Sequence, residues 1–135
     1  MDWKLEVVVV PVSDVDRAKR FYSEQLGFNV DVDQQISETM SVVQMTPPGS
    51  ACSVTIGMGL AGDMAPGSLR GLQLVVSDIE AAHQQLVDNR VDVSGIMHFE
   101  GGEQLPGPGG DWNSFIFFND PDGNSWAIQQ KPAGA

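Results

Sequence analysis

The sequence is poor in cysteine, histidine and basic side chains. Its single cysteine, Cys52, excludes a disulfide within the chain and is typical of a reducing compartment. Only 7 Lys and Arg face 18 Asp and Glu, and the resulting net charge of −11 argues against a nucleic-acid partner, which needs a basic face. No apolar run exceeds strand length, so no membrane span is predicted. Residues 1–6 are charged and do not resemble a signal peptide, so we expect a cytoplasmic protein.

The two halves of the chain carry similar stretches. Residues 12–18, Val-Ser-Asp-Val-Asp-Arg-Ala, reappear as residues 76–82, Val-Ser-Asp-Ile-Glu-Ala-Ala. Asp14 matches Asp78 at an offset of 78 − 14 = 64 residues, nearly half of the chain. An apolar run precedes each copy and a helical pattern follows it. The chain is therefore predicted to be one domain, residues 1–135, built from two copies of one module.

The first module, residues 4–60, is predicted to run β-α-β-β-β. Ser13 and Asp16 fit a capping box at the start of the helix, and Gly27 is a suitable left-handed residue at its end. The strands are expected at residues 4–12, 28–33, 40–46 and 53–58, with a Pro-Pro-Gly-Ser turn between the last two. A glycine-rich linker, residues 59–70, follows.

The second module, residues 70–130, repeats this order. A strand at residues 72–76 leads into a helix that is capped by Ser77 and Glu80 and ends at Asn89. Further strands are expected at residues 91–93, 114–118 and 125–130, the last two joined by the tight turn Asp-Pro-Asp-Gly-Asn, residues 120–124. Residues 100–113 hold five glycines and two prolines and are predicted to form a long irregular loop.

These motifs, in this order and repeated, resemble the vicinal oxygen chelate superfamily of glyoxalases, bleomycin resistance proteins and extradiol dioxygenases. The resemblance covers about residues 4–130. It implies an α+β fold in which two βαβββ modules form a paired, curved mixed sheet around a cleft. It also implies a homodimer, since members are often dimeric, sometimes with modules exchanged between chains.

Enzymes of that superfamily usually bind a divalent metal. The resemblance places the ligands seven residues before each helix-start Asp and four residues after the glycine of the last hairpin turn. In this sequence those positions hold Val7, Gly71 and Ala127, and none has a donor atom in its side chain. We therefore expect no metal and no cofactor at the family position.

Aromatic side chains are the more informative candidates for a ligand site. Tryptophan and phenylalanine side chains line flat pockets that hold planar organic molecules. His98, close in sequence to Glu100, Glu103 and Asp111, offers an acid–base pair or part of a metal site, and a solvated loop is the alternative interpretation. The predicted ligand-binding residues are Trp112, Trp126, Phe99, Phe115 and His98. Because neighbours on a strand face opposite sides, Trp126 and Ala127 cannot both line one face.

Three functions fit these observations. The first is a metal-free binding protein resembling the bleomycin resistance branch, which sequesters an apolar, aromatic and in some cases cationic small molecule, such as an antibiotic, in a dimer cleft. The second is a lyase, isomerase or oxygenase with a non-standard metal or acid–base site around His98. The third is a structural or regulatory dimer. The net charge of −11 favours a cationic ligand and so the first.

Overall fold

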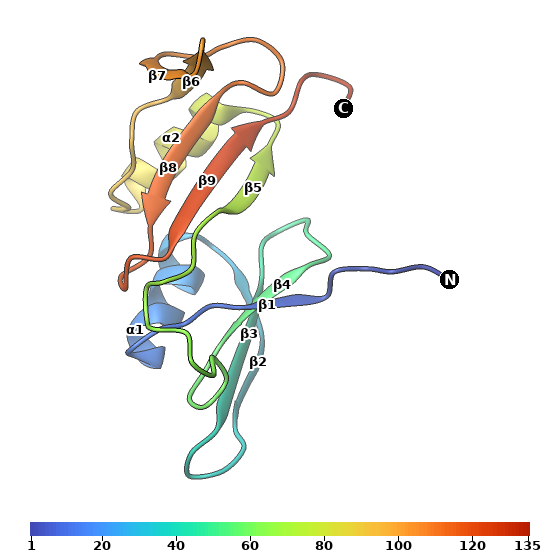
Figure 1. The fold of residues 1–135 in the computed structure, drawn as a ribbon, viewed down its shortest axis with the longest axis vertical. Helices are drawn as coiled ribbons and strands as arrows, with labels where there is room; N and C mark the ends of the chain where they lie inside the picture. The colour runs from blue at the N-terminus through green and yellow to red at the C-terminus, as the bar shows by residue number, and fades with distance from the viewer. The chain divides into compact units, whose positions relative to one another are not determined.

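The computed structural model describes all 135 residues and has an α+β fold of two mixed sheets (Figure 1). The chain divides into two compact units. Unit 1 comprises residues 1–69 together with residues 120–124, and unit 2 comprises residues 70–119 and 125–135. None of the helices has the length and apolar character that crossing a membrane requires.

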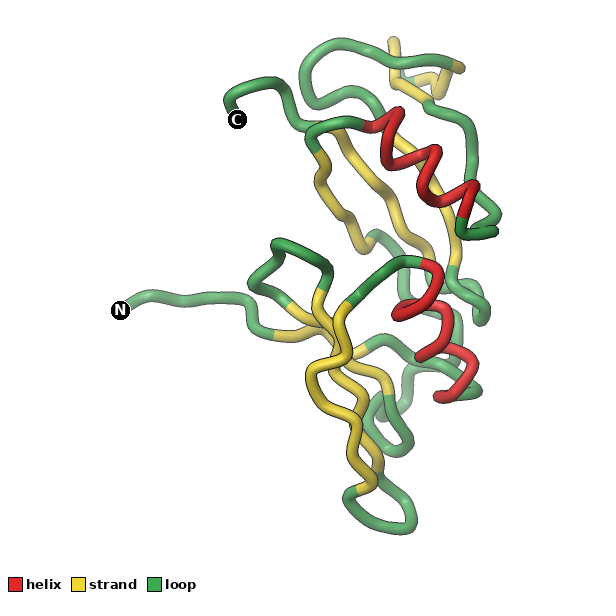
Figure 2. The backbone as a smooth tube through the Cα atoms, turned by 180° about the vertical axis from the view of Figure 1, so that it is seen from behind, coloured by secondary structure: helices red, strands yellow, loops and turns green.

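Unit 1 contains a four-stranded sheet with the order β1-β4-β3-β2. Its helical segment lies along one face of this sheet (Figure 2) and is a short α-helix that continues into a π-helical turn. Gly27 follows with a positive φ of 77°, which confirms the predicted left-handed end of the helix. The bounds are β1 Val7–Val9, α1 Val15–Arg20, η1 Phe21–Gln25, β2 Asn29–Gln35, β3 Ser41–Thr46 and β4 Ser53–Ile56.

Unit 2 contains a five-stranded sheet with the order β5-β9-β8-β6-β7. The helix α2 covers one face of this sheet, as both views of the backbone show (Figures 1 and 2). Ile79 and Leu86 of α2 are buried, because its apolar side chains recur at helical spacing. The bounds are β5 Leu72–Val76, α2 Ile79–Asp88, β6 Met97–Glu100, β7 Glu103–Pro106, β8 Phe115–Asn119 and β9 Ser125–Gln130.

The internal repeat of the sequence is a repeat of topology. In each unit the strand before the helix pairs in parallel with the last strand, β1 with β4 and β5 with β9, and the remaining strands add antiparallel. Unit 2 differs only in the extra strand β7. The predicted α+β class with two βαβββ modules is therefore confirmed.

The predicted capping boxes are wrong. The N-caps are Asp14 and Asp78, whose carboxylates accept hydrogen bonds from Arg17 N and Ala81 N at 3.0 Å. Ser13 instead donates its hydroxyl to Asp122 Oδ1 at 2.5 Å. A carboxylate N-cap also interacts favourably with the positive end of the helix, which explains why aspartate takes this position over the adjacent serine.

Two predictions in the second module are also wrong. Residues 91–93 form no strand, because only Val93 makes an isolated bridge, to Phe118. Residues 100–113 are not wholly irregular, because β6 and β7 pair as a hairpin across Gly101 and Gly102. Both glycines have positive φ, 59° and 84°, which is the conformation that a tight two-residue hairpin turn requires.

The turn at residues 120–124 completes unit 1 through buried polar contacts. Asp120 is 5% exposed, and its Oδ1 accepts hydrogen bonds from the backbone N–H groups of residues 122, 123 and 124. Its Oδ2 accepts the Tyr22 hydroxyl at 2.6 Å and Asn124 Nδ2 at 2.7 Å. Asn124 Nδ2 also donates to the Pro11 carbonyl at 2.8 Å, so a distant segment of the chain supplies part of the interior of this unit.

Candidate functional site

The five-stranded sheet of unit 2 has two faces of different character. On the face toward α2 lie Ile116, Phe118, Trp126 and Ile128, all at most 4% exposed. The other face, called the open face below, carries the alternate residues of the same strands. It consists of Gln73, Val75, Phe115, Phe117, Ala127 and Gln129, which are half-buried or exposed.

Three phenylalanines form a cluster on the open face. The rings of Phe115 and Phe117 stack with centroids 6.0 Å apart and planes 8° from parallel. Phe99 of β6 meets them edge-on, 5.4 Å from Phe115 and 6.3 Å from Phe117, and remains 42% exposed. Phe117 lies opposite Ala127 in the register of β8 and β9, so only a methyl group stands beside this ring on the next strand.

The two predicted tryptophans lie in different environments. Trp126 is 4% exposed and stacks on Phe118 at 6.0 Å, on the side of the sheet that packs against α2. Trp112 is 47% exposed and lies in the loop before β8, with a φ of 59°. Its carbonyl accepts a hydrogen bond from Gln129 Nε2 at 2.7 Å, which holds this part of the loop to the open face. Trp112 is therefore the accessible one of the pair.

The structure separates His98 from the phenylalanine cluster, because His98 and Phe99 are neighbours on one strand and face opposite sides. His98 Nδ1 is bonded to the Gly107 carbonyl at 2.8 Å, and Nε2 lies 3.5 Å from a carboxylate oxygen of Glu100. In the whole chain no three of the His, Cys, Asp and Glu side chains lie close enough together to hold a metal ion. His98 thus has one carboxylate partner and no third ligand.

The residues at the family's metal positions do not fit a metal. Ala127 lies on the open face opposite Phe117, and Val7 is 37% exposed beside Ser53. Gly71 directs its backbone N–H toward Ser125 Oγ at 3.3 Å. The side chains of these three residues are a methyl group in Ala127, an isopropyl group in Val7 and a hydrogen atom in Gly71. None of them provides an oxygen, nitrogen or sulfur donor. No reaction step can be derived through a metal at these positions.

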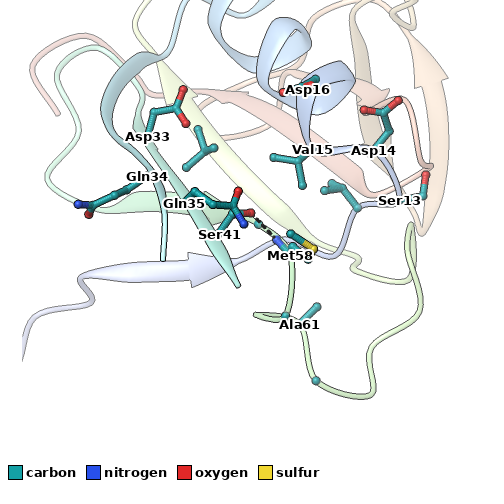
Figure 3. A pocket seen from close by; sticks show the side chains of 15 residues that line it. Ser13, Asp14, Val15, Asp16, Asp33, Gln34, Gln35, Ser41, Met58 and Ala61 are labelled. Carbon is teal, nitrogen blue, oxygen red and sulfur yellow. Dashed lines mark hydrogen bonds between the residues drawn. The ribbon is translucent and has the colours of Figure 1, made fainter. Parts of the chain in front are cut away.

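A separate cavity of about 810 Å³ lies within unit 1 (Figure 3). Asp14 and Asp16 border it from the start of α1, and Asp33 borders it from β2. Two of these carboxylates already have structural partners: Asp14 caps the helix, and Asp33 pairs with Lys19. The hydrogen bond and the charge of Asp33 raise the pKa of Lys19 above its ordinary value. Its charged border makes this cavity unlike the open face, whose six residues carry no charge.

The sequence reasoning missed Phe117, Gln73 and Gln129, which share the open face with Phe115. Two signals were available. Phe115 and Phe117 are two residues apart on a strand, so they face the same side, and Gln129 is two residues from Ala127 in the next strand. Gln73 could be placed on this face only once the register of β5 and β9 was known, since it lies opposite Ala127.

Comparison with known proteins identifies relatives along the whole chain. The model of the Glyoxalase/Bleomycin resistance protein/Dioxygenase superfamily matches residues 4–128. The crystal structure of TnmS3, an antibiotic binding protein from Streptomyces sp. CB03234, is 32% identical, with a TM-score of 0.77 over 96% of this chain and 97% of that one.

A glyoxalase/bleomycin resistance protein from the same organism is 33% identical, with a TM-score of 0.74 over 94% of this chain and 100% of that one. The uncharacterized protein YetH of Bacillus subtilis is 25% identical over 130 residues, which cover 94% of this chain and 98% of YetH.

Proposed function

Since the chain belongs to the Glyoxalase/Bleomycin resistance protein/Dioxygenase superfamily, we propose that it is a metal-free protein that binds and sequesters a planar aromatic small molecule. The observation that carries this proposal is the phenylalanine cluster on the open face of unit 2, with Ala127 beside it. An aromatic ring that stacks on exposed rings gains dispersion and quadrupole energy without any reacting group. Two relatives, one named an antibiotic binding protein and one a glyoxalase/bleomycin resistance protein, support a small-molecule ligand.

Phe99, Phe115 and Phe117 supply the stacking surface in this proposal. Trp112 adds a further exposed ring on the loop whose carbonyl accepts a hydrogen bond from Gln129 of this face. Trp126 and His98 are left out, because the first is buried against Phe118 and the second faces away from the cluster. The net charge of −11 attracts a cationic ligand, and an aromatic face adds roughly 0.5–2 kcal/mol for a cation placed over it.

A second copy of the chain completes the proposed site as a homodimer, in which the ligand lies in a cleft. Several large apolar side chains are exposed in the single chain, among them Trp3 at 88%, Leu5 at 71% and Val75 at 56%. A contiguous exposed apolar patch commonly marks a surface that a partner or a ligand covers, and Phe99 forms such a patch with Phe115 and Phe117. The oligomeric state is measured by sedimentation equilibrium, and we expect a dimer at micromolar concentration.

The test uses acridine orange, a flat cationic dye, and measures its fluorescence anisotropy against protein concentration. We expect saturable binding that weakens with added salt, because the charge attraction is screened. Phe117→Ala should weaken binding about 5- to 30-fold through loss of a stacking ring. Val87→Ala is the control, because Val87 is an exposed apolar residue on α2, the helix that covers the other face of the sheet. Equal affinity of the wild type and Phe117→Ala would refute the assignment of this face.

The alternative function is a lyase, isomerase or oxygenase with a non-standard metal or acid–base site around His98. It has one observation in its favour, the 3.5 Å contact between His98 and Glu100. Elemental analysis of the protein, purified without chelator, tests the metal form of this alternative. We expect less than about 0.1 equivalent of zinc, nickel, manganese or iron. A stoichiometric metal that is lost in His98→Ala would favour the enzyme.

A further inference from the structure

A row of three residues crosses the open face at the level of the proposed ligand. Phe117 of β8 lies opposite Ala127 of β9, and Ala127 lies opposite Gln73 of β5. Neighbouring strands are about 4.8 Å apart, so Phe117 and Gln73 stand roughly 10 Å apart across the sheet. That spacing suits the long axis of a two- or three-ring aromatic system. A ring stacked on Phe117 and lying over Ala127 reaches Gln73 with its edge.

The amide of Gln73 is the end of a chain of hydrogen bonds. Gln73 Nε2 donates to Gln129 Oε1 at 2.7 Å, and Gln129 Nε2 donates to the Trp112 carbonyl at 2.7 Å. A carbonyl can only accept, so the amide of Gln129 must turn its nitrogen toward Trp112. Its oxygen then faces Gln73, which must donate with its own nitrogen. The chemistry of one backbone carbonyl thus fixes the orientation of both side-chain amides.

This arrangement leaves Gln73 Oε1 without a partner on an exposed side chain. An amide oxygen has two lone pairs, and consecutive amide hydrogen bonds polarise one another in the same sense. The free oxygen at the end of the chain is therefore a stronger acceptor than an isolated amide oxygen. It matches a ligand group that donates a hydrogen bond, and it repels a group that only accepts.

The same chain of hydrogen bonds holds Trp112 in place. Trp112 has a φ of 59°, a left-handed conformation that residues other than glycine adopt at a cost and that needs support from its surroundings. The hydrogen bond from Gln129 Nε2 to the Trp112 carbonyl provides that support. Gln129 is therefore a positioning residue for both Trp112 and Gln73.

Resting on the proposed function, we infer that Gln73 Oε1 is a specificity-determining acceptor. It selects flat aromatic ligands that carry an N–H or O–H donor at the ring edge, such as aromatic amines and phenols. Planar molecules of the same size that lack such a donor bind with lower affinity, because they leave this oxygen unpaired and desolvated.

The test compares two dyes with the same cationic tricyclic ring. Proflavine carries primary amino groups at both ends of the tricycle, and acridine orange carries dimethylamino groups there, which have no N–H. Both cations share the N–H of the central ring, so the two dyes differ only in the donors at the ends. Gln73→Met removes the acceptor at similar length. We expect it to weaken proflavine about 5- to 10-fold, the effect of one lost hydrogen bond, and to change acridine orange less than about 2-fold.

Two further variants sharpen the comparison. Gln129→Met releases the amide of Gln73, so proflavine should lose part of its advantage, about 2- to 4-fold. Gln85→Met is the control, because Gln85 is an exposed glutamine on α2, the helix that covers the other face of the sheet. It should leave both affinities unchanged.

The outcomes separate this inference from the proposed function. If Phe117→Ala weakens both dyes while Gln73→Met weakens both equally or neither, the acceptor role of Gln73 is refuted and the aromatic face stands. If neither dye binds, or if Phe117→Ala changes neither affinity, the face itself is refuted together with the role of Gln73. Selective weakening of proflavine in Gln73→Met, with intact binding in Gln85→Met, supports the inference.

Discussion

Removal of one buried hydroxyl, by Tyr22→Phe, tests how strongly the turn at residues 120–124 stabilises unit 1. The Tyr22 side chain is fully buried, and its hydroxyl donates to Asp120 Oδ2 at 2.6 Å. Phenylalanine keeps the ring contacts of Tyr22, with centroids 5.2 Å from Phe21 and 5.7 Å from Phe28. The substitution therefore removes the hydrogen bond and little else.

The magnitude follows from the partners that remain. A hydrogen bond to a charged group contributes about 1.5–3 kcal/mol, and a buried acceptor left without any partner costs more. Asp120 Oδ2 keeps Asn124 Nδ2 at 2.7 Å, so the carboxylate is not left unpaired. We expect the free energy of unfolding to fall by about 1.5–3 kcal/mol and the melting temperature to fall by roughly 5–12 °C.

Urea denaturation followed by circular dichroism measures this loss. The m-value should stay constant, because the surface exposed on unfolding hardly changes. Ser68→Ala is the control: it removes an exposed hydroxyl and should change stability by less than about 0.5 kcal/mol. In an Asp120→Asn background the effect of Tyr22→Phe should shrink, since the amide keeps its oxygen toward the three backbone N–H groups and puts its nitrogen, which cannot accept, in the place of Oδ2. A loss below about 0.5 kcal/mol with an unchanged m-value would refute the reasoning.

Two further predictions concern the same unit. Gly27→Val should lower the free energy of unfolding by about 1–2 kcal/mol, because a β-branched residue must adopt the φ of 77°, although no atom obstructs its Cβ. Gly110→Val is the control: Gly110 has equal space and no positive φ, so this substitution should cost less. Equal thermal shifts of the two variants would contradict the prediction. A fragment of residues 1–69 lacks Asp120 and Asn124 and therefore leaves the Tyr22 hydroxyl and the Pro11 carbonyl without these partners. We expect this fragment to give a poorly dispersed NMR spectrum. A native-like spectrum that does not sharpen further when a peptide of residues 118–126 is added would show that the turn is dispensable.

Much of the fold could be predicted because the repeat carries strong local signals. The aspartates at positions 14 and 78 begin the two helices, and Gly27 ends the first helix as its conformational freedom suggests. The choice between Ser13 and Asp14 as N-cap could not be settled locally, because the partner of Ser13, Asp122, is 109 residues away. The hairpin of β6 and β7 was missed although two adjacent glycines between short strands indicate such a turn.

The candidate site was only partly predictable. Phe99 and Phe115 were identified from composition and position, and the structure places them in contact. Whether Trp126 is accessible, as Trp112 is, depends on which face of β9 packs against α2. One sequence does not decide whether Trp126 or its neighbour Ala127 lies on that face. The roles of Gln73 and Gln129 depend on strand register and on a loop carbonyl, and neither leaves a pattern in the sequence.

The position of the turn at residues 120–124 has a consequence during protein synthesis. Chains generally fold from the N-terminus as they emerge from the ribosome. Here the first unit waits for side chains that follow most of unit 2 in the chain, since residues 70–119 lie between its two parts. The buried hydrogen bonds of Tyr22 and Pro11 to this turn therefore form only after residues 70–119 have been synthesised. A ribosome that stalls earlier leaves a nascent chain whose N-terminal half is still open to chaperones and proteases.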